Sequence, residues 1–111
     1  MFIFVPINFK SIMKATIITT EGDKRQVEFN TFIGARNLIC NEGYSSPIEV
    51  IYLEDGEMLL IDEEGKNKNL SMNSIATEMA HNSESIYPSD YVCGDVIFID
   101  NMTEFDDLPY E

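Results

Sequence analysis

The stretch Pro47–Lys66, PIEVIYLEDGEMLLIDEEGK, decides the fold, because two apolar runs rich in strand-forming residues flank Asp55-Gly56. An Asp-Gly pair between such runs predicts a β-hairpin, since a type I′ turn needs φ above zero at both central residues. A two-residue loop would place Glu54 opposite Glu57, and this fixes the pairing of every residue before and after them. The stretch therefore predicts one hairpin with a defined register.

The two faces of this hairpin are both apolar. Side chains alternate between the faces of a strand, and one face would carry Ile51, Leu53, Met58 and Leu60. The other face would carry Val50, Tyr52, Leu59 and Ile61. Because both faces are apolar, we expect both to be covered and the hairpin to lie at the centre of the domain. The two short helices expected elsewhere in the chain can cover only one face. The face with Val50, Tyr52, Leu59 and Ile61 is then left for the N-terminal segment, the acidic tail or a second subunit. This uncovered face is expected to be an interaction site, for a partner or for a second copy in a homodimer.

The charge of the chain limits the classes of partner. Twenty acidic residues stand against seven basic ones in 111 residues, which gives a formal charge of −13. Between Asn69 and Glu111 there are nine acidic residues and no lysine or arginine. Such a chain repels phosphate backbones and approaches basic proteins rapidly. Direct binding of nucleic acid is therefore not expected. High solubility alone is the alternative explanation of the charge.

The cysteines and the first residues bear on location. Cys40 and Cys93 match no metal-binding or redox spacing, so both are interpreted as reduced, buried thiols. Residues 1–12, MFIFVPINFKSI, lack the basic start of a signal peptide and are interpreted as an N-terminal extension or an accessory strand. No stretch is long and apolar enough for a membrane span. A cytoplasmic protein is expected.

The rest of the chain predicts strands and helices in the order β-β-α-β-β-α-β. Asn30 or Thr31 is expected to cap the first helix and Ser71 the second. The expected elements are strands 14–20 and 25–30, a helix from Phe32, the hairpin, a helix from Ser71, and a strand 91–100. This order predicts an α+β fold, with a mainly antiparallel sheet and two short helices packed on one face. Residues 13–101 would form a single domain and residues 102–111 an acidic tail.

Several motifs occur together in an order known from one family. They are Gly43…Pro47-Ile48-Glu49-Val50, the Asp55-Gly56 turn, Ile61-Asp62-Glu63-Glu64-Gly65-Lys66, Leu70…Asn73 and Asp90-Tyr91-Val92-Cys93-Gly94-Asp95-Val96-Ile97. With these motifs the chain resembles domain of unknown function 3846, a small family carried mainly by phages and mobile elements of bacteria. The segment from Tyr44 to Pro47 is longer here, and Ser71-Met72 stands where the family usually has a proline. The resemblance implies a phage-type protein in a bacterial cytoplasm and brings no activity.

Residues that could carry chemistry are few. His81 is the only histidine, and its place near a helix C-terminus favours a structural role. The run Asp62-Glu63-Glu64-Gly65 lacks the alternation of a calcium loop. Arg25 and Arg36 are the only arginines, and no glycine-rich phosphate loop is present. The sequence therefore predicts no enzyme, no metal site and no cofactor.

Two acidic features are candidates for partner binding. The first is the hairpin tip and the second is the tail, in which aromatic residues alternate with acids. The candidate residues are Tyr52, Glu54, Asp55 and Glu57 at the tip, and Phe105, Asp106, Asp107 and Tyr110 in the tail. A solvent-exposed turn and a frayed terminus are the structural alternatives.

The favoured function is that of a small acidic, non-enzymatic protein that binds a basic surface of a protein partner. Together with the resemblance, this predicts an inhibitor of a host defence or nucleic-acid-binding protein, similar to anti-restriction or anti-CRISPR proteins. The alternative is a small-ligand binder that sequesters a nucleotide immune signal.

Overall fold

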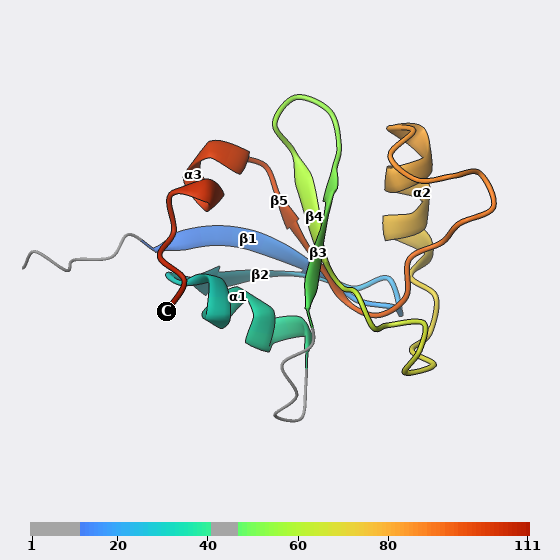
Figure 1. Cartoon of the computed structure of the whole chain (residues 1–111), viewed down its shortest axis with the longest axis horizontal. Helices are drawn as coiled ribbons and strands as arrows, with labels where there is room; N and C mark the ends of the chain where they lie inside the picture. The colour runs from blue at the N-terminus through green and yellow to red at the C-terminus, as the bar shows by residue number, and fades with distance from the viewer. Residues whose placement is uncertain (1–11, 41–46) are drawn as a thin grey trace, which may run out of the picture.

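The computed structural model describes residues 12–40 and 47–111, and their fold is α+β (Figure 1). Expectations that rest on residues 1–11 and 41–46, including the accessory strand, lie outside the described residues. The elements are β1 (Met13–Ile18), β2 (Lys24–Phe29), α1 (Phe32–Ile39), β3 (Ile48–Tyr52), β4 (Met58–Asp62), α2 (Ser74–Asn82), β5 (Val96–Ile99) and α3 (Met102–Asp106). The predicted fold class is thus confirmed, and α3 is an additional helix.

The five described strands form one antiparallel sheet in the order β2-β1-β5-β4-β3. The last strand, β5, lies in the middle and joins the first hairpin to the second. The prediction that the second hairpin lies at the centre was therefore half wrong. Its strand β4 is buried at every position, but β3 is an edge strand. Local sequence signals cannot reveal this, because the pairing of β5 joins segments far apart in the chain.

The hairpin turn forms as predicted, with φ of 56° at Asp55 and 78° at Gly56. The register, however, differs by one residue from the predicted one. Ile51 pairs with Leu59 rather than with Leu60. The cause is an extra residue before the turn: the Glu57 amide donates to the Glu54 carbonyl, while the Glu57 carbonyl accepts from Leu53. Two residues thus lie opposite one, which is a β-bulge.

This shift of one residue regroups the side chains, since side chains alternate along a strand. Ile51, Leu59 and Ile61 share one face and pack with Ala76 and Ala80 of α2. The opposite face packs with α1 and α3, and its buried residues include Met13, Ile17, Phe29, Ala35, Ile39, Met58, Leu60, Ile97, Ile99 and Phe105. The prediction that both helices cover one face was wrong. One face of the sheet is covered by α2, and the other by α1 and α3.

The predicted uncovered apolar face is also absent. Leu59 and Ile61, which were assigned to it, are 0% and 7% exposed. Val50 is partly buried against the core on the α1 side. Tyr52 is the exception, at 59% exposed. The expectation of a homodimer through an apolar sheet face thus loses the surface on which it was based.

The helix caps are only partly as expected. Thr31 caps α1, because its hydroxyl accepts from the Gly34 amide at 2.9 Å. The cap of α2 is Asn73 and not Ser71, since the Asn73 side chain accepts from the Ala76 amide at 3.0 Å. Met72 lies before this helix and forms a β-bridge with Cys93.

The C-terminal segment belongs to the folded domain. Phe105 in α3 is buried between Phe29 and Phe32, with ring centroids 6.5 and 6.1 Å away. The first two amides of α1, Phe32 and Ile33, donate to the carbonyls of Pro109 and Tyr110 at 2.9 Å. These amides have no partner inside their own helix. The segment predicted to be a separate tail therefore completes α1.

Candidate functional site

The two edges of the sheet differ in charge. The edge strand β2, KRQVEF, carries Lys24, Arg25 and Glu28, all exposed. The edge strand β3, IEVIY, carries only Glu49 among apolar side chains. Charged side chains on an edge strand discourage the addition of further strands. Among the described strands, β3 is therefore the edge less protected against strand addition.

The hydrogen bonds beside β3 show which of its backbone groups point outward. The Leu53 amide donates to the Glu57 carbonyl, and the Glu63 amide donates to the Pro47 carbonyl. The backbone polar groups of residues 47 and 53 therefore point towards β4. Because the direction alternates along an antiparallel strand, residues 48, 50 and 52 face away from β4. The contact of Tyr52 agrees with this: its carbonyl accepts a hydrogen bond from the Ser85 hydroxyl, in the segment after α2.

A hollow of about 860 Å³ lies beside this edge, between β3 and the segment that follows α2. Three of its lining residues carry carboxylates, namely Glu49, Glu84 and Asp90. The remaining lining residues are His81, Ser85, Ile86, Tyr87 and Pro88. Ile86 packs on the core of the α2 face and so anchors the segment. The hollow is thus an acidic surface feature attached to the core.

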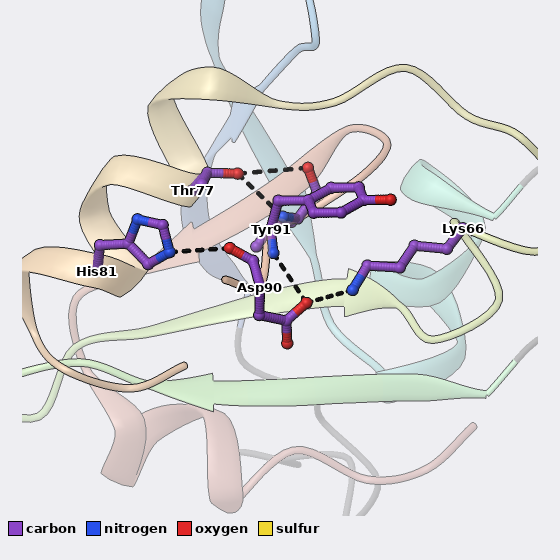
Figure 2. Close-up of polar contacts among 6 residues, drawn as sticks. Lys66, Thr77, His81, Asp90 and Tyr91 are labelled. Atoms are coloured by element: carbon purple, nitrogen blue, oxygen red, sulfur yellow. Dashed lines mark hydrogen bonds and ion pairs between the residues drawn. The ribbon is translucent and has the colours of Figure 1, made fainter. Parts of the chain in front are cut away.

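Asp90 is the centre of the polar contacts around the hollow (Figure 2). Its carboxylate accepts from the Tyr91 amide at 2.8 Å and forms an ion pair with Lys66. The Lys66 ammonium also lies 4.4 Å from the centroid of the Tyr91 ring. The Asp90 carbonyl lies 2.8 Å from Nε2 of His81, the histidine on α2. These contacts hold one wall of the hollow in place.

The same contacts shift two pKa values. The hydrogen bond from Lys66, together with that from the Tyr91 amide, lowers the pKa of Asp90. The hydrogen bond to Asp90 raises the pKa of Lys66. Asp90 is therefore ionised at neutral pH and already has a cation beside it. Neither Glu49 nor Glu84 forms an ion pair with another described residue.

The candidate residues at the hairpin tip lie on the surface. Glu54 and Asp55 are exposed, Glu57 is partly buried, and Tyr52 is exposed at the end of β3. Glu54 and Glu57 flank the two-residue turn as expected, and the Glu57 amide donates to the Glu54 carbonyl at 3.0 Å. The tip is next to the β3 edge along the chain, so it can add negative charge at one end of that edge.

The candidate residues in the C-terminal segment lie in two environments. Phe105 is 7% exposed and forms part of the core, so it cannot also anchor the chain to a partner in this conformation. Tyr110 stacks on Phe32 with ring centroids 5.5 Å apart but is 61% exposed. Asp106 and Asp107 are exposed. Of the four, the two aspartates and Tyr110 are accessible to a partner.

Groups that could carry chemistry are dispersed in the described part of the chain. There, no three His, Cys, Asp or Glu side chains lie together where they could hold a metal ion. Cys40 and Cys93 are free and buried, as predicted. The helices within residues 12–40 and 47–111 are all too short or too polar to cross a membrane.

Comparison of the chain with protein families, curated proteins and solved structures finds no match. The resemblance to domain of unknown function 3846 therefore stays a prediction. The candidate site rests on the geometry of β3 and of the adjoining hollow. Sequence reasoning missed this site, although one signal was present: Glu49 is a lone charge in an apolar strand. The position of Glu84 and Asp90 beside it depends on the path of the segment after α2.

Proposed function

We propose that this protein is a non-enzymatic binding protein that docks on a basic surface of a protein partner. The placement of its charge is the observation that carries the proposal. Between Asn69 and Glu111 there are nine acidic residues and no basic ones. Seven of the nine are exposed, namely Glu78, Glu84, Asp100, Glu104, Asp106, Asp107 and Glu111. An excess of exposed charge of one sign speeds association with a partner of the opposite sign.

The biological setting is proposed from this charge together with the resemblance to a phage-borne family. The protein would act in a bacterial cytoplasm and occupy the basic groove of a host defence or nucleic-acid-binding protein. Its action would then be similar to that of anti-restriction or anti-CRISPR proteins. An acidic surface competes well for such a groove because it meets the same cationic side chains as a phosphate backbone does.

Sequestration of a nucleotide signal is the second candidate, and the hollow of about 860 Å³ is the observation in its favour. Pockets of this size accept small ligands. Its three carboxylates would repel phosphate, however, so this candidate has weaker support. A thermal-shift screen with linear and cyclic nucleotides tests it, and a clear rise in melting temperature would favour it over protein binding.

Capture from a bacterial lysate tests the first proposal. The full chain is immobilised, and retained proteins are identified at low and at high ionic strength. A retained protein is then purified, and its affinity is measured over a series of salt concentrations. We expect affinity to fall steeply with salt, because exposed charges are screened. A triple variant, Glu104→Gln with Asp106→Asn and Asp107→Asn, should bind more weakly. Absence of any retained protein, or binding insensitive to salt, would refute the proposal.

A further inference from the structure

We propose that the open edge of β3 binds an extended basic segment of a protein partner, which adds to the sheet as a further strand. This inference rests on the proposed function and deepens it by naming the binding edge and the form of the bound segment. Its basis is the outward backbone of β3, the acidic hollow beside it and the different chemistry of the two sheet edges.

The backbone of β3 supplies the pairing groups. Residues 48, 50 and 52 direct their amides and carbonyls away from β4. The Tyr52 carbonyl is already occupied by the Ser85 hydroxyl. Within the described residues, the outward groups of Ile48 and Val50 have no hydrogen-bond partner. An extended peptide can pair with such an edge through its own backbone, which supplies affinity independent of sequence.

The hollow supplies the preference for a basic segment. In an added strand every second side chain would point to the α2 face of the sheet, where Glu49 lines the hollow. Asp90 is neutralised by Lys66, which leaves Glu49 and Glu84 for a cation brought by a partner. A lysine or arginine at that position has a long, flexible side chain that can extend into the hollow that these carboxylates line. Charge complementarity thus selects the occupant.

The opposite face of the added strand would meet different side chains. Tyr52 is 59% exposed and follows Ile48 and Val50 on the α1 side. An apolar side chain of the partner would lie beside them. The fitting segment therefore alternates a basic residue with a strand-forming apolar residue. The edge strand β2 of a second copy, KRQVEF, does not have this strict alternation.

A proline at the edge tests strand addition with little harm to the fold. The Val50 amide points away from β4, so Val50→Pro removes an outward donor and no bond of the hairpin. The matched control is Gln26→Pro on β2. The Thr19 amide donates to Asp23, so alternate residues from 23 onward bond to β1 and the Gln26 amide points outward. Each variant removes one outward-pointing backbone amide, Val50→Pro at the β3 edge of the sheet and Gln26→Pro at the β2 edge. Circular dichroism and thermal melts check that both fold.

The probe is a short capped peptide that alternates lysine with valine, and its binding to the full chain is measured by fluorescence anisotropy. We expect saturable binding that Val50→Pro weakens about tenfold or more, because several backbone hydrogen bonds are lost together. Gln26→Pro should bind like the wild type. Glu49→Gln, which keeps the edge but removes a charge, should bind about two- to fivefold more weakly. In hydrogen exchange, the peptide should protect the amides of Ile48, Val50 and Tyr52.

Several results would overturn the inference. One is equal binding of the peptide by the wild type and by Val50→Pro. Equal affinity for a peptide with glutamate in place of lysine would show that the edge does not select a basic segment. A dimer that Val50→Pro dissociates in sedimentation experiments would mean that a second copy occupies the edge. If a lysate partner binds in a salt-sensitive way but Val50→Pro binds it normally, the proposed function stands and this edge is not its site.

Discussion

The Asn73 side-chain amide donates a hydrogen bond of 3.0 Å to the carbonyl of Ile18, a residue 55 positions earlier in the chain. The same amide nitrogen donates to the Gly94 carbonyl, also at 3.0 Å, and the side-chain oxygen caps α2 through the Ala76 amide. Asn73 is 0% exposed. One fully satisfied side chain thus joins the start of α2, the end of β1 and the approach to β5.

We expect Asn73→Ala to lower the free energy of unfolding by about 2–4 kcal/mol. The loss of a helix cap costs about 1 kcal/mol, and two buried carbonyls lose their donor as well. Urea denaturation followed by circular dichroism measures the change. Ser71→Ala is the matched control, since Ser71 is exposed and does not cap the helix. An equal loss of stability in the two variants would contradict this assignment.

The hairpin shows how far the sequence predicts the fold. Local signals identified the strands, the turn at Asp55-Gly56 and the fold class. They missed the bulge beside Leu53, and one extra residue exchanged the faces of β3 relative to β4. The same error produced an apparent uncovered face. In the folded domain, α1 and α2 lie on opposite faces, and no local signal along the chain specifies that choice.

The candidate site was less predictable than the fold. The tip residues were found because acidic residues at an Asp-Gly turn favour the surface, and Glu54 and Asp55 are exposed there. The β3 edge was missed, since edge position depends on β5 inserting between β1 and β4. Phe105 was misjudged because its partners, Phe29 and Phe32, are more than seventy positions earlier in the chain. The sequence around Phe105 shows no helical periodicity that would predict this contact, because α3 has only five residues.

Phe105 should contribute strongly to the stability of the fold, because it is a core residue. We expect Phe105→Ala to lower the free energy of unfolding by about 3–5 kcal/mol, as for other buried phenylalanines. Tyr110→Ala should lower the free energy of unfolding by less, because the tyrosine side chain is largely exposed. Chemical denaturation compares the two variants. If the denaturation curve of Phe105→Ala matches that of the wild type, residues 102–111 do not belong to the folded domain.

Cys40 should resist alkylation in the native protein. Burial, with a further contribution from the charge of Asp62, raises the pKa of its thiol from 9.0 to about 11. At pH 8 this reduces the reactive thiolate about a hundredfold. Iodoacetamide labelling of Cys40, followed by mass spectrometry, should therefore be slow in buffer and fast in urea. Equal rates in the two conditions would contradict the buried position.

The raised pKa of Cys40 also predicts a dependence of stability on pH. The unfolded thiol loses its proton near pH 9, whereas the folded thiol keeps it until about pH 11. The contribution of the buried, protonated thiol to the free energy of unfolding is therefore complete below pH 9 and is lost as the pH rises from 9 to about 11. The difference in unfolding free energy between the wild type and Cys40→Ala should narrow over this range. A constant difference would show that the thiol does not titrate differently in the two states.

Gly65 should tolerate no side chain, because a Cβ atom there would lie 2.8 Å from the Cys93 carbonyl oxygen and 3.2 Å from that of Asp62. Both atoms belong to the backbone, and the Gly65 amide itself donates to the Asp62 carbonyl at 3.0 Å. The chain must therefore move to relieve the clash, and we expect Gly65→Ala to cost about 2–4 kcal/mol.

The matched control for this variant is Gly56→Ala at the hairpin turn. A Cβ atom at Gly56 meets no heavy atom within 4 Å, but φ there is 78°. The expected cost is only about 1 kcal/mol, which reflects backbone strain without a clash. Denaturation in urea should rank Gly65→Ala well below Gly56→Ala in stability. The reverse order would mean that the close approach of Gly65 to Cys93 relaxes easily, and that turn strain dominates in this domain.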